Sequence, residues 1–95
     1  MARIGIFDSG VGGLTVQRAI IDRLPALDTV CLGDKARLPY GPKSPEVVTQ
    51  YSLRAAAFLA NQGIDLLVVA CNTASSVALP ALRQAHRIPI LGVVE

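Results

Sequence analysis

Short apolar runs alternate with amphipathic segments along all 95 residues of the chain. Nearly every side chain of the runs is apolar, whereas between them apolar side chains recur every three or four residues, the period of a helix. The pattern therefore predicts the order β-α-β-α-β-α-β. The predicted strands are Arg3–Phe7, Thr29–Leu32, Asp65–Ala70 and Ile88–Val94, and the predicted helices are Leu14–Leu24, a segment from Pro45 that stops before Gly63, and Ala74–His86.

The connections between these strands indicate how the sheet is built. They are too long for hairpins and long enough for the crossover helices that join parallel strands. Right-handed crossovers place helices on the faces of such a sheet, so we predict an α/β three-layer sandwich with a parallel sheet. The length corresponds to one small domain, residues 1–95. The run Asp65–Ala70 is apolar almost throughout, which is typical of a strand covered on both faces.

Two helix boundaries carry further signals. Ser44 precedes Pro45, and a serine cap followed by proline is typical of a helix start. We expect Thr73 or Ser75 to cap the last helix, and Pro80 to kink or restart it.

The composition excludes several classes of protein. Hydrophobic residues make up 52% of the chain and the net charge is only +2, so the chain is not intrinsically disordered. The basic residues form no stripe, and we expect no nucleic-acid partner. No apolar run approaches the ~18 residues of a membrane span, so no membrane partner is expected. The two cysteines are too few for a disulfide scaffold, which favours the cytoplasm.

Ligands of parallel sheets bind beyond the carboxyl ends of the strands. The loop after the first predicted strand, Asp8 to Gly13, is rich in glycine but lacks both the dinucleotide-binding spacing and the Gly-Lys-Ser/Thr of a phosphate loop. Its backbone amides could hold an anion at a helix start, or its glycines could only permit a tight turn. Asp8 is correspondingly a general base or ligand clamp, or else an Asx-turn residue.

Cys71 follows a buried strand and precedes a predicted helix. The positive end of the helix dipole favours a thiolate at such a position. Asn72 and Thr73 supply hydrogen-bond donors beside it. These residues suit a reactive cysteine, and a plain buried cysteine is the alternative. The other cysteine and the one histidine lack ligand spacing, so no metal site is expected.

Other residues have plainer interpretations. Cys31 lies between Val30 and Leu32 in the second strand and is expected to be a small core residue. His86, near a helix end, is expected to be structural. Tyr40 lies in a rigid turn and is either a lid over the strand ends or a filler of the core.

Four segments of the chain match the pattern of a known family in register: Phe7 to Val16, Gly33-Asp34 with Ala36 to Gly41 and Lys43-Ser44, Ala70 to Ser75, and Gly92 to Glu95. Together they resemble bacterial glutamate racemases. A cysteine followed by Asn-Thr is shared with aspartate and other amino-acid racemases, whereas the glycine-rich loop and the Pro-Tyr-Gly turn point to the glutamate branch.

This resemblance implies a cofactor-independent enzyme that interconverts L- and D-glutamate and supplies D-glutamate for peptidoglycan. Two cysteines would flank the substrate, one removing the α-proton while the other delivers a proton to the opposite face. By motif matching, Cys71 would be one of these bases, and Asp8 would assist it and hold the amino group. The matching positions that would bind the substrate's amino and carboxylate groups are Ser9, Asn72 and Thr73, and those that would line the pocket are Pro39, Tyr40 and Gly41.

The chain also departs from the family pattern. Lys35 replaces a small polar residue and Cys31 an aromatic one, and both are expected to be tolerated. The second cysteine of the family lies in a second domain, so this chain is expected to be a flavodoxin-like half-domain, inactive alone, with an apolar face that further chain would cover. The resemblance also implies a homodimer. The alternatives are an aspartate racemase-like isomerase and a non-catalytic module that binds a small anion.

Overall fold

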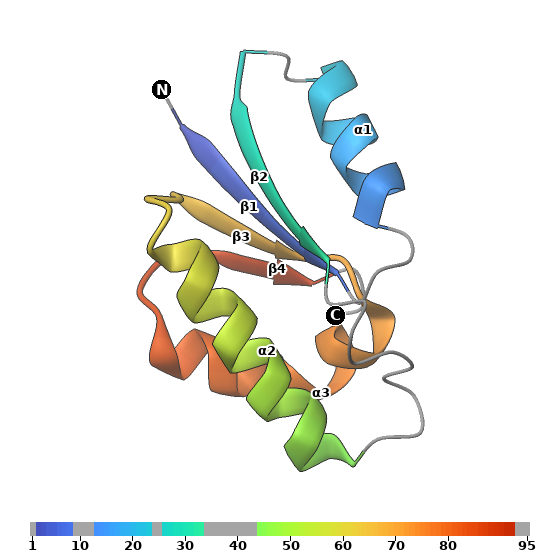
Figure 1. Ribbon diagram of the computed structural model, residues 1–95, viewed down its shortest axis with the longest axis vertical. Coiled ribbons are helices and arrows are strands. Elements are labelled where there is room, and N and C mark those ends of the chain that lie inside the picture. Colours follow the sequence, from blue (N-terminus) through green and yellow to red (C-terminus); the bar gives the residue numbers. More distant parts are fainter. Residues whose placement is uncertain (1, 9–12, 24–25, 34–43, 93–95) are drawn as a thin grey trace.

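The computed structural model describes residues 2–8, 13–23, 26–33 and 44–92. Within them, strands and helices alternate in the predicted order (Figure 1). None of the described helices is long and apolar enough to cross a membrane. The elements are β1 (Arg3–Asp8), α1 (Gly13–Arg23), β2 (Asp28–Gly33), α2 (Pro45–Ala60), β3 (Leu66–Val69), α3 (Asn72–Ala85) and β4 (Ile90–Gly92).

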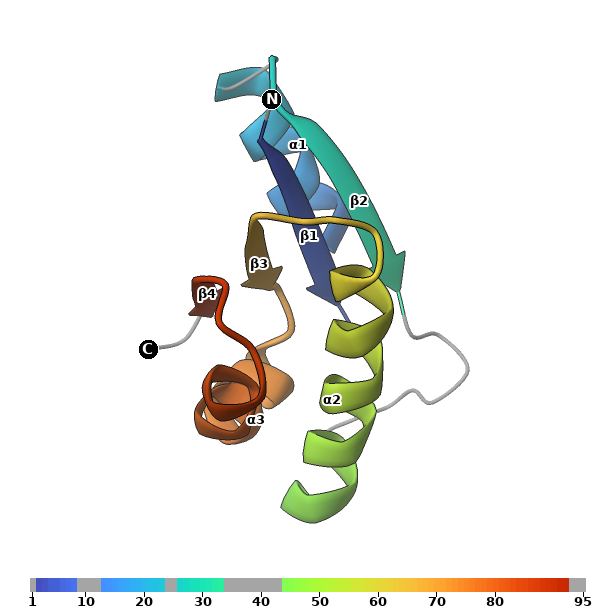
Figure 2. The same cartoon turned by 90° about the vertical axis from the view of Figure 1, so that its left-hand side faces the viewer.

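The four strands form one parallel sheet in the order β2-β1-β3-β4. The chain steps from β1 to β2 in one direction and then crosses back to β3 and β4 in the other. Because crossovers are right-handed, this reversal places α1 on one face of the sheet and α2 and α3 on the other (Figure 2). The predicted three-layer α/β sandwich is confirmed, and the strand order is that of flavodoxin-like folds.

The larger core lies between the sheet and the helices α2 and α3, which also pack against each other. Alternate side chains of a strand point to the same face. Phe7 of β1 and Val69 of β3 are therefore fully buried on this side, and Val30 and Leu32 of β2 pack against them at the sheet's edge. The helices contribute mainly small and branched apolar side chains, namely Val48, Ala55, Ala56, Leu59, Ala74, Ala78, Leu79 and Leu82.

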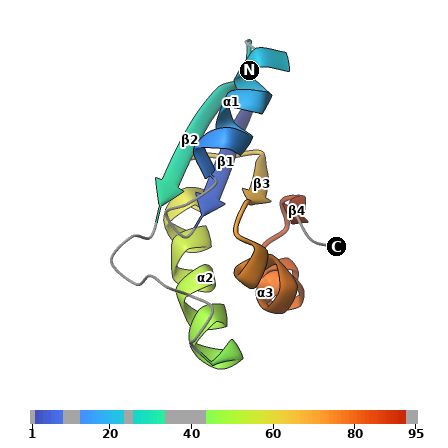
Figure 3. The ribbon, with the colours of Figure 1, turned by 90° about the vertical axis from the view of Figure 1, so that its right-hand side faces the viewer.

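A smaller core, formed by Ile4, Ile6 and Ala70, lies on the opposite face of the sheet. Ile20 of α1 packs against it. Helix α1 contacts β1 and β2. Figure 3 shows α1 in front of these two strands, and no described helix stands in front of β3 and β4 on this side.

The apolar side chains of β3 and β4 on that side form what we call the uncovered face: Leu66, Val68 and Leu91. Leu66 and Val68 are half-buried, and Leu91, which pairs with Val68, is 50% exposed. The prediction that β3 is covered on both faces is therefore wrong, because α1 lies over β1 and β2 instead. Of the expected exposed apolar face, the described residues show one exposed side chain, Leu91, beside the half-buried Leu66 and Val68.

Helix α2 begins as predicted. The Ser44 hydroxyl accepts a hydrogen bond from the backbone N–H of Val47 at 3.2 Å, and Pro45 occupies the first turn. Beyond the end of the helix, Gly63 has a φ of 74°. This left-handed conformation, which favours glycine, turns the chain into β3.

Helix α3 begins earlier than predicted. Cys71 is its N-cap residue and makes no side-chain capping bond, so the prediction that Thr73 or Ser75 caps the helix is wrong. The N–H of Ser75 already donates to the Cys71 carbonyl at 2.8 Å, which places Ser75 inside the first turn. The helix also runs through Pro80 without a restart. The buried side chains of Leu79 and Leu82 hold it against the core across that position.

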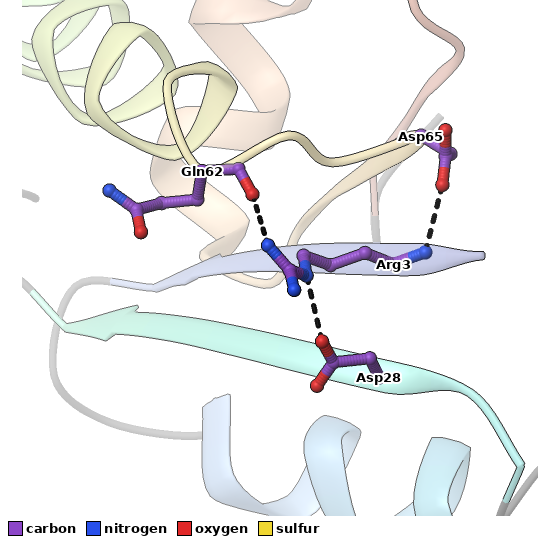
Figure 4. A network of polar contacts seen from close by, with 4 residues as sticks. All are labelled: Arg3, Asp28, Gln62 and Asp65. Carbon is purple, nitrogen blue, oxygen red and sulfur yellow. Dashed lines mark hydrogen bonds and ion pairs between the residues drawn. The ribbon is translucent and has the colours of Figure 1, made fainter. Parts of the chain in front are cut away.

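A polar network joins the amino-terminal ends of the strands (Figure 4). The Arg3 guanidinium pairs with the Asp28 carboxylate at 2.7 Å and donates to the backbone carbonyl of Gln62, while the Arg3 backbone N–H donates to Asp65 at 2.9 Å. The side chains of the ion pair are 43% and 51% exposed, so the pair contributes at most about 1 kcal/mol. Its effect is to tie β1 to β2 and to the connection that leads into β3.

Candidate active site

The sheet reverses its strand order between β1 and β3, the two central strands. In open parallel sheets, the crevice at the carboxyl ends beside such a reversal is where ligands bind. The Ala70 N–H donates to the Phe7 carbonyl at 2.7 Å, so the two strands remain hydrogen-bonded up to their ends. The residues that follow this bond, Asp8 and Cys71, therefore belong to neighbouring strand ends.

Asp8 is the last residue of β1 and is only 5% exposed. It lies two residues after Ile6, so its side chain belongs to the α1 side of the sheet. A buried carboxyl group is costly unless it is hydrogen-bonded. Asp8 Oδ2 accepts a hydrogen bond from the Cys31 thiol, with 3.8 Å between sulfur and oxygen. Asp8 makes other interactions as well, and this bond is the one that links the end of β1 to β2.

Cys71 is 5% exposed and packs in the larger core. As N-cap it has an extended backbone, with φ −96° and ψ 124°. Its thiol makes no capping bond, and the amides of the first helical turn lie beside it at the positive end of the helix dipole. The position thus combines a buried sulfur with backbone donors that favour an anionic ligand such as a carboxylate.

Cys31 contradicts the prediction of a small core residue, because it is exposed. Val30 and Leu32 point toward the larger core, so the residue between them must point to the opposite face. There β2 is the edge of the sheet. Partial desolvation of the sulfur, repulsion by the Asp8 carboxylate and the hydrogen bond to it raise the pKa of the Cys31 thiol above its ordinary value.

This raised pKa predicts a loss of stability at alkaline pH. The folded state keeps the Cys31 proton to higher pH than the unfolded chain does. The thiol's contribution is therefore complete below the unfolded-state pKa and is lost as the pH rises through the folded-state pKa. Replacing Cys31 with serine removes this titration. Urea unfolding between pH 7 and 10.5 should therefore show a steeper alkaline decline in the free energy of unfolding for the parent protein than for Cys31→Ser. Parallel curves would contradict the prediction.

Asn72 and Thr73 form the start of α3, directly after Cys71. Thr73 is half-buried, and the side chain of Asn72 lies outside the described part of the chain. The other residues predicted for the substrate site also lie outside it: Ser9, Pro39, Tyr40 and Gly41.

A surface hollow of about 580 Å³ lies at the opposite end of the sheet, lined by Arg3, Ala26, Leu27, Asp28 and Gly63. Its charged side chains already bond to each other in the network of Figure 4. No group of three or more metal-ligating side chains occurs among the residues that the structure describes. The chemistry therefore points to the carboxyl ends of β1 and β3 rather than to this hollow.

Comparison with known proteins identifies the family of the chain. The sequence profile of the Asp/Glu/Hydantoin racemase family matches residues 4–95. The chain belongs to this family. It is 64% identical over 92 residues to a glutamate racemase of Geobacter metallireducens, covering 97% of this chain and 34% of that protein.

Solved structures of the family share the fold. Glutamate racemase from Aquifex pyrophilus superimposes with a TM-score of 0.94 at 54% identity, over 96% of this chain and 36% of that one. The enzyme from Francisella tularensis, solved in complex with D-glutamate, superimposes with a TM-score of 0.91 at 39% identity, over 97% of this chain and 35% of that one. The chain thus spans about a third of the length of these relatives.

The contact between Cys31 and Asp8 was missed by the sequence interpretation. Strict alternation in β2 already assigns Cys31 to the face opposite Val30 and Leu32. The identity of its neighbour required the pairing of β2 with β1, which aligns Cys31 with Ile6.

Proposed function

We propose that this chain supplies one half of the active site of a cofactor-independent glutamate racemase. The observation that carries the proposal is the buried Cys71 at the start of α3, in a racemase-family chain. Cys71 follows β3, and β3 pairs with β1, which ends at the buried Asp8. A thiolate is a suitable base for an α-proton, and a site that excludes water strengthens the electrostatic interactions around it. The relatives that match at 64% and 54% identity are glutamate racemases.

In this mechanism the Cys71 thiolate removes the α-proton of one glutamate enantiomer. The Cα–H bond breaks, the proton passes to sulfur and the electron pair remains on the α-carbon. A second thiol, supplied by chain beyond these residues, gives its proton to the opposite face. In the reverse direction the two thiols exchange roles. Asp8 holds the substrate's amino group and assists Cys71.

The start of α3 is suited to the substrate's carboxylate. The first-turn amides carry the positive end of the helix dipole, and Cys71 leaves them without a side-chain cap. Asn72 and Thr73 would bind the amino and carboxylate groups together with Ser9. The substrate pocket would be completed by Pro39, Tyr40 and Gly41.

The uncovered face supports the proposal that residues 1–95 form a half-domain. Leu91 is 50% exposed and lies beside the half-buried Val68. Apolar patches of this kind mark surfaces that another segment covers. The matching relatives are about three times as long as this chain. We therefore propose that further chain covers Leu66, Val68 and Leu91 and brings the second cysteine.

The racemase would supply D-glutamate for peptidoglycan, and we place it in the cytoplasm as a homodimer. Aspartate is the competing substrate, because the matching family includes aspartate racemases.

The test measures racemisation by circular dichroism with L- and D-glutamate and with both aspartate enantiomers. We expect the full-length protein that carries this chain to racemise glutamate in both directions, and the 95-residue chain alone to be inactive. A full-length protein that prefers aspartate would replace the proposed substrate. Racemisation by the 95-residue chain at the full-length rate would overturn the half-site.

A further inference from the structure

Cys31 and Asp8 meet across the two strands at one edge of the sheet. In the parallel pairing of β1 with β2, Ile6 is aligned with Cys31, and Asp8 lies one alternation further along β1 on the same face. The sulfur of Cys31 lies 3.8 Å from Oδ2 of Asp8. The two side chains thus come from different elements, and the register of the sheet brings them together.

The direction of this hydrogen bond follows from the chemistry of the two groups. An ionised carboxylate only accepts hydrogen bonds, whereas a protonated thiol can donate one. The pKa of the Cys31 thiol is raised by desolvation and by Asp8, so the sulfur keeps its proton under physiological conditions. Cys31 therefore donates and Asp8 accepts.

We propose that Cys31 is a positioning residue, whose thiol donates to the Asp8 carboxylate and holds it in the orientation used for racemisation. This inference rests on the proposed function, in which Asp8 assists Cys71. Asp8 is 5% exposed, whereas Cys31 lies on the exposed edge strand. The bond thus fixes a buried acidic side chain from outside the larger core, without occupying the space beside Cys71.

The other surroundings of this pair offer little charge among the described residues. The side chains on this face of β3, Leu66 and Val68, and that of Ala70, which follows the strand, are apolar. The charged side chains of the described part of α1 are all exposed to solvent: Arg18, Asp22 and Arg23. The hydrogen bond from the Cys31 thiol thus links β2 to Asp8 on this face.

A purely structural role for Cys31 makes the opposite prediction about substitutions. Valine is branched and apolar and suits a strand better than serine does. If Cys31 only filled the edge strand, Cys31→Val would be the milder change. If the hydrogen-bond donor matters, Cys31→Ser keeps it and Cys31→Val removes it, so the order of the two variants reverses.

The experiment compares these variants in the full-length racemase that carries this chain. We expect Cys31→Ser to keep kcat with glutamate within about threefold, and Cys31→Val to lower kcat about tenfold with little change in KM, which is typical of losing one hydrogen bond to a charged group. Thr29→Val, two residues earlier on the same face of β2, is the matched control and should leave both constants unchanged. Thermal unfolding of each variant shows that it is folded.

The outcomes separate the two proposals. An active parent enzyme in which Cys31→Val is as active as Cys31→Ser, or more active, overturns the positioning role alone. A parent enzyme that does not racemise glutamate overturns the proposed function and the positioning role with it. Loss of activity in Cys31→Val with recovery in Cys31→Ser supports the donor.

Discussion

On the proposed two-base mechanism, we expect Cys71→Ser to lower the turnover of glutamate about 10³-fold or more in both directions, measured in the full-length protein that carries this chain. Serine has nearly the same shape as cysteine, but its hydroxyl does not ionise near neutral pH and cannot remove an α-proton. In the proposed mechanism each direction of the reaction needs both thiols, one as base and the other as acid. Losing Cys71 therefore stops conversion of L-glutamate as well as of D-glutamate. Circular dichroism of the glutamate solution measures both directions.

The control for this substitution lies on the same helix. Ser76 is exposed on α3, and Ser76→Ala should keep turnover within about twofold, since exposed substitutions of this kind cost little. Thermal unfolding should show Cys71→Ser folded, because the change is nearly isosteric. If Cys71→Ser turned over both enantiomers within tenfold of the parent rate, Cys71 would not be one of the two bases.

Gly92→Val destabilises the protein by about 3 kcal/mol, because α3 packs directly on the backbone of β4 at this residue. A Cβ atom at Gly92 would overlap the hydroxyl of Ser75 and come within 2.6 Å of Leu79 Cδ1. Both side chains are buried, at 2% and 5% exposure, so neither has free space to move into. The helix would have to shift away from the sheet.

This shift also reaches the candidate site. Ser75 bonds through its N–H to the carbonyl of Cys71, so a displacement at Ser75 moves the start of α3. Urea unfolding of Gly92→Val measures the loss of stability. Gln84→Ala, at an exposed position of the same helix α3, is the control and should cost less than about 1 kcal/mol. Equal losses in the two variants would show that Gly92 is not a point of close approach.

The order of strands and helices follows from local signals that act over a few residues. Helical and strand periods differ, so the alternation of the two predicts seven elements in the right order. The start of α2 is also local, because the Ser44 cap and Pro45 act on the adjacent turn. The start of α3 is less local. Cys71 occupies the N-cap position although its side chain makes no capping hydrogen bond. Its side chain packs in the larger core instead, so this helix start depends on tertiary packing.

The candidate site also depends partly on the sequence pattern and partly on the strand order. Parallel strands bring their carboxyl ends to one edge, so Asp8 and Cys71 could be assigned to that edge from the sequence pattern. Their placement on neighbouring strands depends on the order β2-β1-β3-β4. An order that separated β1 from β3 would satisfy the same apolar pattern and leave these two residues apart.

The sequence by itself determined the element order, the parallel sheet and the edge at which chemistry is expected, because these depend on periodicity and on the handedness of crossovers. Only the tertiary structure decided that Cys31 is exposed and donates to Asp8, that Gly92 leaves room for α3, and that no described helix covers β3 and β4 on the side of α1. These features depend on contacts between residues far apart in the chain. Such contacts are set by strand order and by which helix covers which strands, and neither is encoded in the pattern of a single segment.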